Sequence, residues 1–296
     1  MTGDRILAAD VGGLVMGTDL ERGASRAAML YFSADDEGRT HIAKQFAPYP
    51  FHICRPFYVS GDPLGMATVY VQSCAGGIFE RDRLALTIQA ESGCMAHVTT
   101  SASTIVHSMP KGEATQSVTL IADRDSWIEY LPDPMILFAG ARIDSTVNVI
   151  VNDGARVVLS DAFLMHDHRD KGGAFENLRS EIIVRDGNDS VLVRDRFHLD
   201  GRSMLARVPG VTGRFMAQAS FIFLSRGLST ELLATLRNAL DSIADIYAGV
   251  SLLPAGAGIF SRILAADGIA LRTAQLCLWS ETRKYLTGVV PTARRK

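Results

Sequence analysis

Apolar and polar residues alternate with a period of two along most of the chain between residues 26 and 222. Such alternation is typical of half-buried β-strands, because successive side chains point to opposite faces of a sheet. Val, Ile and Thr dominate these runs, and β-branched residues fit a pleated surface. The pattern predicts strands at 67–72, 84–89, 94–99, 117–122, 146–151, 157–160, 181–185 and 191–196.

Turn-forming residues separate the predicted strands at nearly regular intervals. Gly93, Asp125, Gly154 and Gly187 are 32, 29 and 33 residues apart, and a similar short apolar strand follows each of them. A period of about 30 residues is typical of stacked β units that bury their faces on one another. An antiparallel protein with a turn after every two or three strands would show a similar spacing, so both interpretations stay open.

The last third of the chain follows a helical pattern. Ser229 can cap a helix, and Glu231 in the first turn favours the helix dipole. Leucines and isoleucines then recur at helical spacing as far as Ile246, and Gly249 is expected to close this helix. A second helix is predicted from about 269 to 286, with glycine and proline after it.

Length and composition fit one globular protein. The sequence predicts a poorly defined lead over 1–25 and a single domain over 26–296, with a β body at 26–225 and a helical region at 226–290. With 47% hydrophobic residues the chain can build a core without disulfides. A net charge of -2 argues against nucleic acid as a partner. No apolar segment reaches the roughly 20 residues of a membrane span, so we expect a cytoplasmic protein.

Three carboxylates border apolar runs, and each could therefore point inward: Asp82, Asp161 and Asp195. A buried carboxylate must be paired or must bind a ligand, because an isolated ionised one is too costly. An equally open alternative is that Asp82 and Asp195 simply pair with neighbouring or cross-strand arginines.

A second set of candidate ligands is the pair His166 and His168, which would lie on one face of a strand. With Asp161 nearby they could hold a divalent metal, since imidazole suits nickel or zinc. A polar loop between strands is the competing interpretation, and it is the one we favour. The common signatures of serine hydrolases, P-loop enzymes and dinucleotide-binding folds do not occur.

Two prolines within the segment Leu131-Pro132-Asp133-Pro134 remove backbone donors and stop a strand. An unbroken apolar run over 135–138 follows, and it is either core or an interaction surface. The stretch 129–142, EYLPDPMILFAGAR, closely resembles the central signature of the UreD (UreH) family of urease accessory proteins. Further segments resemble family blocks in the same order, at 55–58, 70–72, 76–78, 82–84, 99–104 and 271–279.

The sequence also departs from the family pattern. Arg81 precedes Asp82 where the family usually has glycine, and the segment Gly172-Gly173-Ala174-Phe175 lacks the acidic residue that often precedes this phenylalanine. A divergent paralogue that serves a second urease therefore stays open.

The resemblance implies a mostly β, elongated, non-enzymatic scaffold of stacked antiparallel or mixed sheets with a two-helix C-terminal region. It implies apo-urease, UreF and UreG as partners. It implies no tightly bound cofactor, but a transient nickel ion that passes through an internal polar tunnel.

By position, the tunnel residues carried over from the resemblance are Asp82, Ser103, Thr104, Asp161 and Asp195. Scattered oxygen ligands suit transit, because they hold nickel less tightly than a Cys and His cage. Exposed apolar patches usually mark partner surfaces, and the residues expected to contact partners are Pro132, Pro134, Leu137, Phe138, Arg142 and Trp279. The alternatives are a metal-dependent enzyme that uses His166, His168 and Asp161, and a purely structural β protein.

Overall fold

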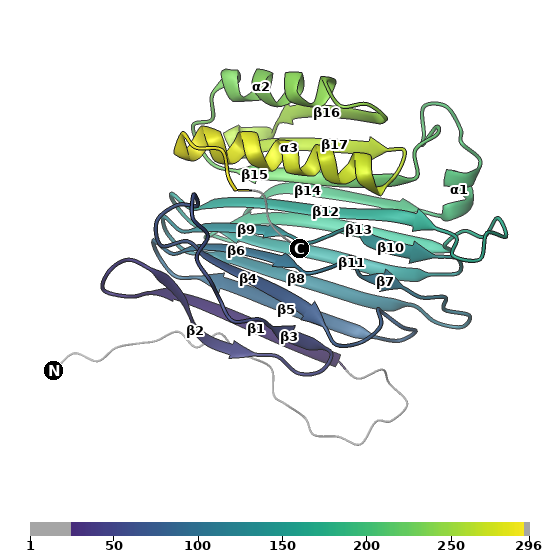
Figure 1. Cartoon of the computed structure of the whole chain (residues 1–296), viewed down its shortest axis with the longest axis horizontal. Coiled ribbons are helices and arrows are strands. Elements are labelled where there is room, and N and C mark those ends of the chain that lie inside the picture. The colour runs from purple at the N-terminus through teal and green to yellow at the C-terminus, as the bar shows by residue number, and fades with distance from the viewer. Residues whose placement is uncertain (1–24, 293–296) are drawn as a thin grey trace.

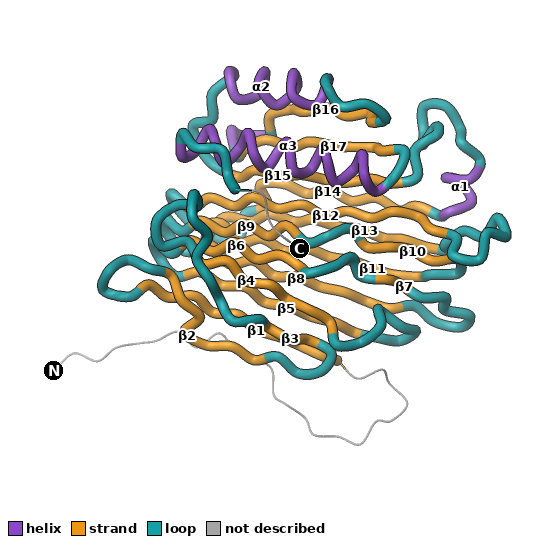
Figure 2. The backbone as a smooth tube through the Cα atoms, in the orientation of Figure 1, coloured by secondary structure: helices purple, strands orange, loops and turns teal. Residues whose placement is uncertain are grey.

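The computed structural model describes residues 25–292, which form two β-sheets packed face to face with helices on one side (Figures 1 and 2). The seven-stranded sheet has the order β14 (Val191–Leu199), β13 (Asn177–Asp186), β11 (Arg142–Val151), β8 (Ala114–Ala122), β5 (Arg83–Ala90), β1 (Ser25–Ala34), β2 (Thr40–Phe46). The predicted lead, except for residue 25, lies outside the described residues.

The ten-stranded sheet has the order β16 (Ile246–Leu252), β17 (Gly258–Ala265), β15 (Ala217–Leu224), β12 (Arg156–His166), β9 (Trp127–Leu131), β6 (Met95–Thr100), β4 (Ala67–Ser73), β3 (Phe51–Ile53). Off this path, β10 (Met135–Phe138) pairs with β12 and with β7 (Ile105–Val106). The helices are α1 (Gly201–Leu205), α2 (Thr230–Asp241) and α3 (Gly268–Thr287), with a short 3-10 turn at η1 (Pro254–Gly256).

The alternating pattern places strands as expected, since each predicted segment overlaps an observed strand. β11 shows the cause: Ile143, Ser145, Val147 and Val149 are buried, and the residues between them are more exposed. The chain winds repeatedly from the seven-stranded to the ten-stranded sheet, from β5 to β6, from β8 to β9 and from β11 to β12. Successive coils pair in parallel within each sheet, which confirms the stacked-unit interpretation.

The turns of successive coils also stack on one another. The N–H of Gly93 donates to the carbonyl of Arg124 at 3.0 Å, and the N–H of Asp125 donates to the carbonyl of Asp153 at 3.0 Å. Gly154 has a φ of 72°, and a Cβ there would meet Oδ1 of Asp125 at 1.9 Å. Glycine is therefore required at this turn, both for its backbone conformation and for the close approach of the turn below it.

The fourth regularly spaced turn, around Gly187, ends the coil. It joins β13 and β14 as antiparallel neighbours in the same sheet. The carboxylate of Asp186 accepts hydrogen bonds from the N–H groups of Asn188 and Ser190 at 2.9 and 3.0 Å. This side chain closes a hairpin, so the chain stays in the seven-stranded sheet.

Three apolar clusters form the core. The turn-end cluster lies between the sheets near the stacked turns and includes Phe32, Ile88, Val98, Leu120 and Val149. The far-end cluster lies between the sheets at their other end and includes Ile78, Val106, Leu137, Ile143 and Phe163. The helix-side cluster joins the outer face of the ten-stranded sheet to α2 and α3 and includes Phe221, Leu236, Ile263, Leu271 and Leu278.

The C-terminal region begins as predicted, with the Ser229 hydroxyl accepting a hydrogen bond from the N–H of Leu232 at 3.2 Å. The prediction that this helix continues to Gly249 is wrong, because α2 ends at Asp241 and Asp245 adopts a φ of 61°. Residues 246–252 also fit a period of two, and they form β16 at the edge of the sheet. β17 follows, so the helical region also supplies two strands.

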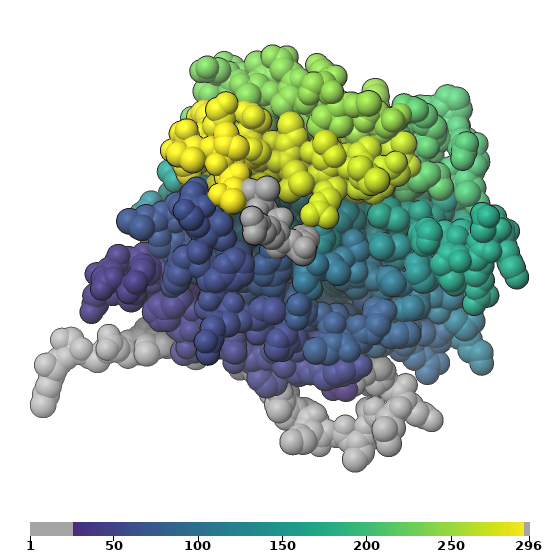
Figure 3. All heavy atoms as spheres, in the orientation of Figure 1, coloured from purple at the N-terminus to yellow at the C-terminus, as the bar shows by residue number. Residues whose placement is uncertain are grey.

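The second predicted helix is confirmed as α3, which Asp267 caps at its start and Gly288 ends with a φ of 74°. α2 and α3 cover one side of the ten-stranded sheet and form a continuous block of atoms in Figure 3. No helix among residues 25–292 has the length and apolar character that a membrane crossing requires.

A buried ionic network joins α3 to the sheet beneath it. Glu129 on β9 is fully buried, and its carboxylate accepts hydrogen bonds from Arg283 at 2.6 and 2.9 Å and from Nε1 of Trp279 at 2.8 Å. His97 on β6 bonds the same carboxylate, and Arg283 also bonds Asp62 at 2.7 Å. Burial alone would raise the pKa of Glu129, but the hydrogen bond from His97 and the charge of Arg283 outweigh it and hold this pKa well below its usual range.

We predict that Arg283→Met lowers the free energy of unfolding by about 3 to 5 kcal/mol, because it leaves the Glu129 charge buried without its main partner. Urea unfolding followed by circular dichroism measures this change. Lys284→Ala, on the exposed side of the same helix, is the matched control and is expected to change the free energy by less than about 0.5 kcal/mol. Equal effects of the two substitutions would contradict a clamp at Arg283.

Candidate functional site

A row of polar side chains crosses the inner face of each sheet, between the turn-end and far-end clusters. In the seven-stranded sheet the row occupies paired register positions of three parallel strands: Gln116 on β8, Ser145 on β11 and Ser180 on β13. In the ten-stranded sheet it occupies paired positions of three adjacent strands: Asp161 on β12, Ser220 on β15 and Arg262 on β17. An otherwise apolar sandwich thus carries a polar stripe across its middle.

Hydrogen bonds join the two rows across the space between the sheets. Ser180 donates to Oδ2 of Asp161 at 2.9 Å. Asp195 on β14 accepts from the hydroxyl of Ser220 at 3.3 Å and from the guanidinium of Arg262 at 2.6 Å. These two rows together with Asp195 are called the polar layer below. Its charged groups satisfy one another at the β14 and β17 side of the sandwich.

Asp161 is the carboxylate of the polar layer that no cation contacts directly among the described side chains. Burial raises its pKa, the Ser180 hydroxyl opposes this by hydrogen bonding to the charged form, and the nearby charge of Asp195 raises it again. The more distant Arg262 compensates only in part. A carboxyl group in such a position holds a proton more readily than an exposed aspartate and can exchange it for a cation.

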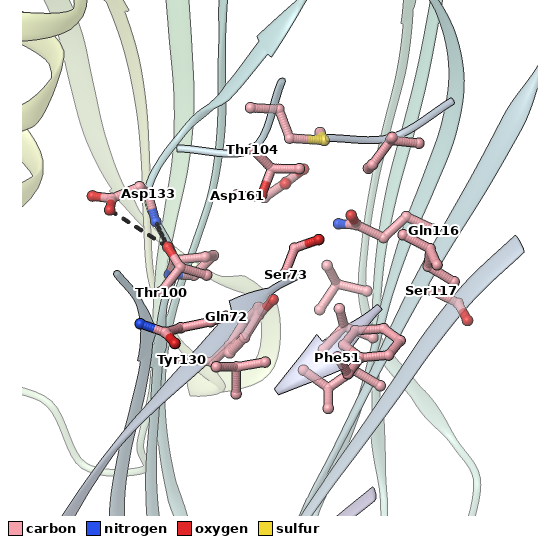
Figure 4. Close-up of a pocket in the computed structure, with 18 of the residues that line it drawn as sticks. Phe51, Gln72, Ser73, Thr100, Thr104, Gln116, Ser117, Tyr130, Asp133 and Asp161 are labelled. Carbon is pink, nitrogen blue, oxygen red and sulfur yellow. Dashed lines mark hydrogen bonds between the residues drawn. The ribbon is translucent and has the colours of Figure 1, made fainter. Parts of the chain in front are cut away.

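A cavity of about 90 Å³ lies between the sheets next to Asp161 (Figure 4). Asp161 and Gln116 approach this space from opposite sheets, and Ser73 at the end of β4 lies between them. The polar lining is completed by Thr100, Thr104, Ser117, Tyr130 and Asp133. Several water molecules, or a small ion with part of its hydration shell, fit a cavity of this size.

A second cavity of about 230 Å³ adjoins the first and shares Ser73, Thr100 and Thr104 with it. Its wall contains Gly77, which has a φ of 139°, and a Cβ there would meet the carbonyl oxygen of Ile105 at 2.3 Å. The absence of a side chain lets this loop come close to β7, and the N–H of Ile78 donates to the same carbonyl at 2.7 Å. Gly77 thus shapes the wall of this second cavity.

Known proteins with similar sequences identify the family. The family model described as UreD urease accessory protein matches residues 25–296. The chain belongs to the UreD family. It is 41% identical over 272 residues to urease accessory protein UreD 1 of Pseudomonas syringae pv. syringae strain B728a, covering 92% of this chain and 95% of that protein.

Two more relatives agree. UreD 1 of Pseudomonas syringae pv. tomato strain DC3000 is 40% identical over 270 residues, covering 91% of this chain and 95% of that protein. UreD 1 of Methylorubrum extorquens strain PA1 is 35% identical over 261 residues, covering 88% of each. Membership of this family supports a role in urease maturation.

The structure of this UreD chain brings some of the predicted tunnel residues together and separates others. Asp161 and Thr104 line the inter-sheet cavity, and Ser103 lines the outer cavity. Asp195 lies in the polar layer but is paired with Arg262, as the arginine alternative anticipated. Asp82 lies in neither cavity, because its carboxylate accepts a hydrogen bond from the N–H of Phe79 at 2.8 Å within a turn.

The predicted partner residues divide between surface and core. Leu137 is 0% exposed and Trp279 is 4% exposed, so both pack inside the chain. Pro134 is buried as well, and Pro132 lines the inter-sheet cavity. Phe138, whose ring stacks on His168 at 4.3 Å, and Arg142, which lies beside Glu176, are half-buried at the surface, and Pro132 is half-buried as well.

The structure separates the side chains of the alternative metal site. Asp161 faces the space between the sheets, whereas His166, five residues along the same strand, is exposed at its end. His168 lies beyond the strand against the ring of Phe138. Within residues 25–292 no group of three or more His, Cys, Asp or Glu side chains is placed to hold a metal ion.

Sequence reasoning missed most of the polar lining. Gln116, Ser145 and Ser180 occupy positions where the alternation places an inward-facing residue, and each is flanked two residues away by apolar ones. A single polar residue at an inward-facing position would not indicate a site. The recurrence of one in each coil, at intervals of 29 and 35 residues, is a sequence pattern from which the polar row could have been predicted. Asp133 and Tyr130 lie within the family signature, but no sequence pattern marks them as residues that line a cavity.

We predict that Asp161→Asn stabilises the folded chain at neutral pH, by a few degrees in Tm. The folded-state pKa of Asp161 is raised, so the protonated form of this side chain favours the folded state. This contribution to stability is fully present below the unfolded-state pKa of about 3.9 and is lost as pH rises through the folded-state pKa. The advantage of the amide is therefore largest above that raised pKa and vanishes below about pH 4. Thermal unfolding at a series of pH values measures it, and equal Tm values for the two proteins at every pH would refute it.

Proposed function

We propose that this chain is a urease maturation factor that binds apo-urease, recruits UreF and UreG, and gives nickel ions a passage through its β-sandwich toward the urease active site. The observation that supports the passage is the polar layer with its adjoining cavity. A polar stripe through a protein core is costly unless every group is satisfied. A polar stripe between two well-packed apolar clusters is what a route for a hydrated cation requires.

The chemistry of the lining suits transit rather than storage. Carboxylate, hydroxyl and amide oxygens from Asp161, Thr104 and Gln116 are hard ligands, and nickel is held more tightly by imidazole or thiolate. Arg262 already neutralises Asp195, so Asp161 supplies the available negative charge. A cation that reaches Asp161 displaces its proton, and the raised pKa of this carboxyl makes release by reprotonation easier.

A scaffold role also agrees with the arrangement of reactive groups. The described residues contain no cluster of metal-ligating side chains, and the relatives named above carry the description of accessory proteins rather than enzymes. The candidate contact surface for partners includes Phe138 and Arg142 at the exposed end of β10 and the start of β11. These two residues lie at the far end of the sandwich, away from the stacked turns.

The maturation role is tested in cells that contain the other urease genes, with and without this gene and with no second UreD gene. We expect urease nickel content and activity both to be lost without it and to be restored by the intact gene. Full nickel loading in its absence would exclude the role.

The passage is tested by comparing two aspartates at limiting nickel. Asp161→Asn is expected to lower the nickel content of urease several-fold, because it removes the only carboxylate of the layer that is not paired with arginine. Asp82→Asn is the matched control and is expected to load urease normally, since Asp82 lies outside both cavities and an amide oxygen can still accept from Phe79. Equal loading by both variants would mean that nickel does not use the polar layer.

A further inference from the structure

The ten-stranded sheet is interrupted beside the inter-sheet cavity. The paired strands β6 and β9 end at Thr100 and Leu131, and pairing resumes only with β7 and β10, at Ile105 and Met135. The intervening segment contains Pro132 and Pro134, which have no N–H to donate to a neighbouring strand. A backbone ladder therefore cannot close the sheet at this point.

Side chains bridge the break instead. The N–H of Asp133 donates to Oγ1 of Thr100 at 2.8 Å, and the Thr100 hydroxyl lies 3.5 Å from Oδ2 of Asp133 (Figure 4). On the strand side of the break, Thr99 donates to the carbonyl of Leu131 at 2.6 Å. Bonds made by hydroxyl and carboxylate groups can open through side-chain rotation, which a continuous ladder does not allow.

Open space lies on both sides of this break. The inter-sheet cavity is lined by Pro132 and Asp133, and the same two residues line a groove of about 240 Å³ on the opposite face of the sheet. The outer wall of the groove is α3, which contributes Gln275 and Ser280 among others. Gln275 donates to the hydroxyl of Ser160 at 2.8 Å, so the groove also has a polar lining.

We propose that the inter-sheet cavity opens sideways through this break into the groove beneath α3, and that the Asp133 carboxylate binds the divalent cation at the opening. This inference rests on the proposed passage and adds its direction. Asp161 and Asp133 then offer carboxylates in succession, one inside the sandwich and one in the break. Arg272 also lines the groove, and its positive charge disfavours retention of a cation there, so the groove serves for transfer and not for storage.

The competing explanation is that Asp133 only shapes the turn between β9 and β10. Two substitutions separate these roles. Asp133→Asn removes the charge but keeps the side-chain volume and the backbone N–H that bonds Thr100. Thr100→Val removes the hydroxyl that holds this N–H but keeps the Asp133 carboxylate. If Asp133 is a transfer ligand, the first substitution lowers nickel loading more than the second. If Asp133 only shapes the turn, the second substitution lowers Tm and nickel loading at least as much as the first.

The experiment measures nickel per urease active site in cells that express the full urease gene set at limiting nickel, with each UreD variant. We expect Asp133→Asn to lower nickel loading several-fold and Asp133→Glu to restore most of it. Thr100→Val, which removes a lining hydroxyl but no charge, is expected to lower nickel loading clearly less than Asp133→Asn does. Asp36→Asn, an exposed carboxylate far along the chain from the break, is the surface control. The Tm of purified Asp133→Asn and its recovery with urease are expected to match those of the native protein.

The result with Asp161→Asn distinguishes failure of this inference from failure of the passage itself. Low loading with Asp161→Asn and normal loading with Asp133→Asn would overturn the sideways opening and leave the passage intact. Normal loading with both would overturn the passage and the opening together. An equal loss of nickel loading with Asp133→Asn and Thr100→Val, accompanied by a lower Tm in both, would assign Asp133 a structural role and overturn the inference.

Discussion

The carboxylate of Glu129 is completely enclosed by protein, and it stays ionised only because His97, Trp279 and Arg283 bond to it. Arg283 lies between the rings of Trp279 and Trp127, 5.3 Å from each ring centroid. His97 comes from β6, whereas Trp279 and Arg283 both come from α3, so the network fixes α3 against β6 and β9 at once. The groove beneath α3 and the interrupted part of the sheet both depend on this attachment. The reason is that β9, the strand that contains Glu129, ends at the break.

The polar layer shows how a sandwich can contain a row of hydrophilic groups without losing its core. The turn-end and far-end clusters pack the two sheets together on either side of the layer, so a few polar positions per coil do not separate the sheets. Within the layer, Asp195 and Arg262 satisfy each other, whereas Asp161 has only the Ser180 hydroxyl as a direct neutral partner. In the proposed passage, stability and function are opposed at Asp161, since an amide there would favour folding and lose the charge that a cation needs.

Much of this fold is present in the sequence pattern, because most inward-facing positions are apolar and successive coils repeat the same kind of turn. The pattern alone does not distinguish a coil turn from the hairpin at Gly187, where the Asp186 side chain decides the outcome. Around Ile246 the pattern is compatible with either a helix or a strand, because the neighbouring residues fit both periods. At the site, the position of an aspartate beside an apolar run does not show whether its side chain points into the space between the sheets. Asp161 does point inward, whereas the carboxylate of Asp82 is held in a turn by a backbone N–H, a contact that no sequence pattern displays.

The stacked coils have a consequence for how the chain acquires its structure. Parallel neighbours within each sheet come from consecutive coils about 30 residues apart, so each new coil needs only the one before it as a template. Because each coil has nearly the same length, the entropic cost of closing it is nearly the same for every coil. The pairings between distant segments that slow the assembly of many β-sandwiches are not needed here. Each coil can therefore form on the coil before it, and α2, β16, β17 and α3, which follow the coils in the sequence, pack onto a sheet that the coils have already built.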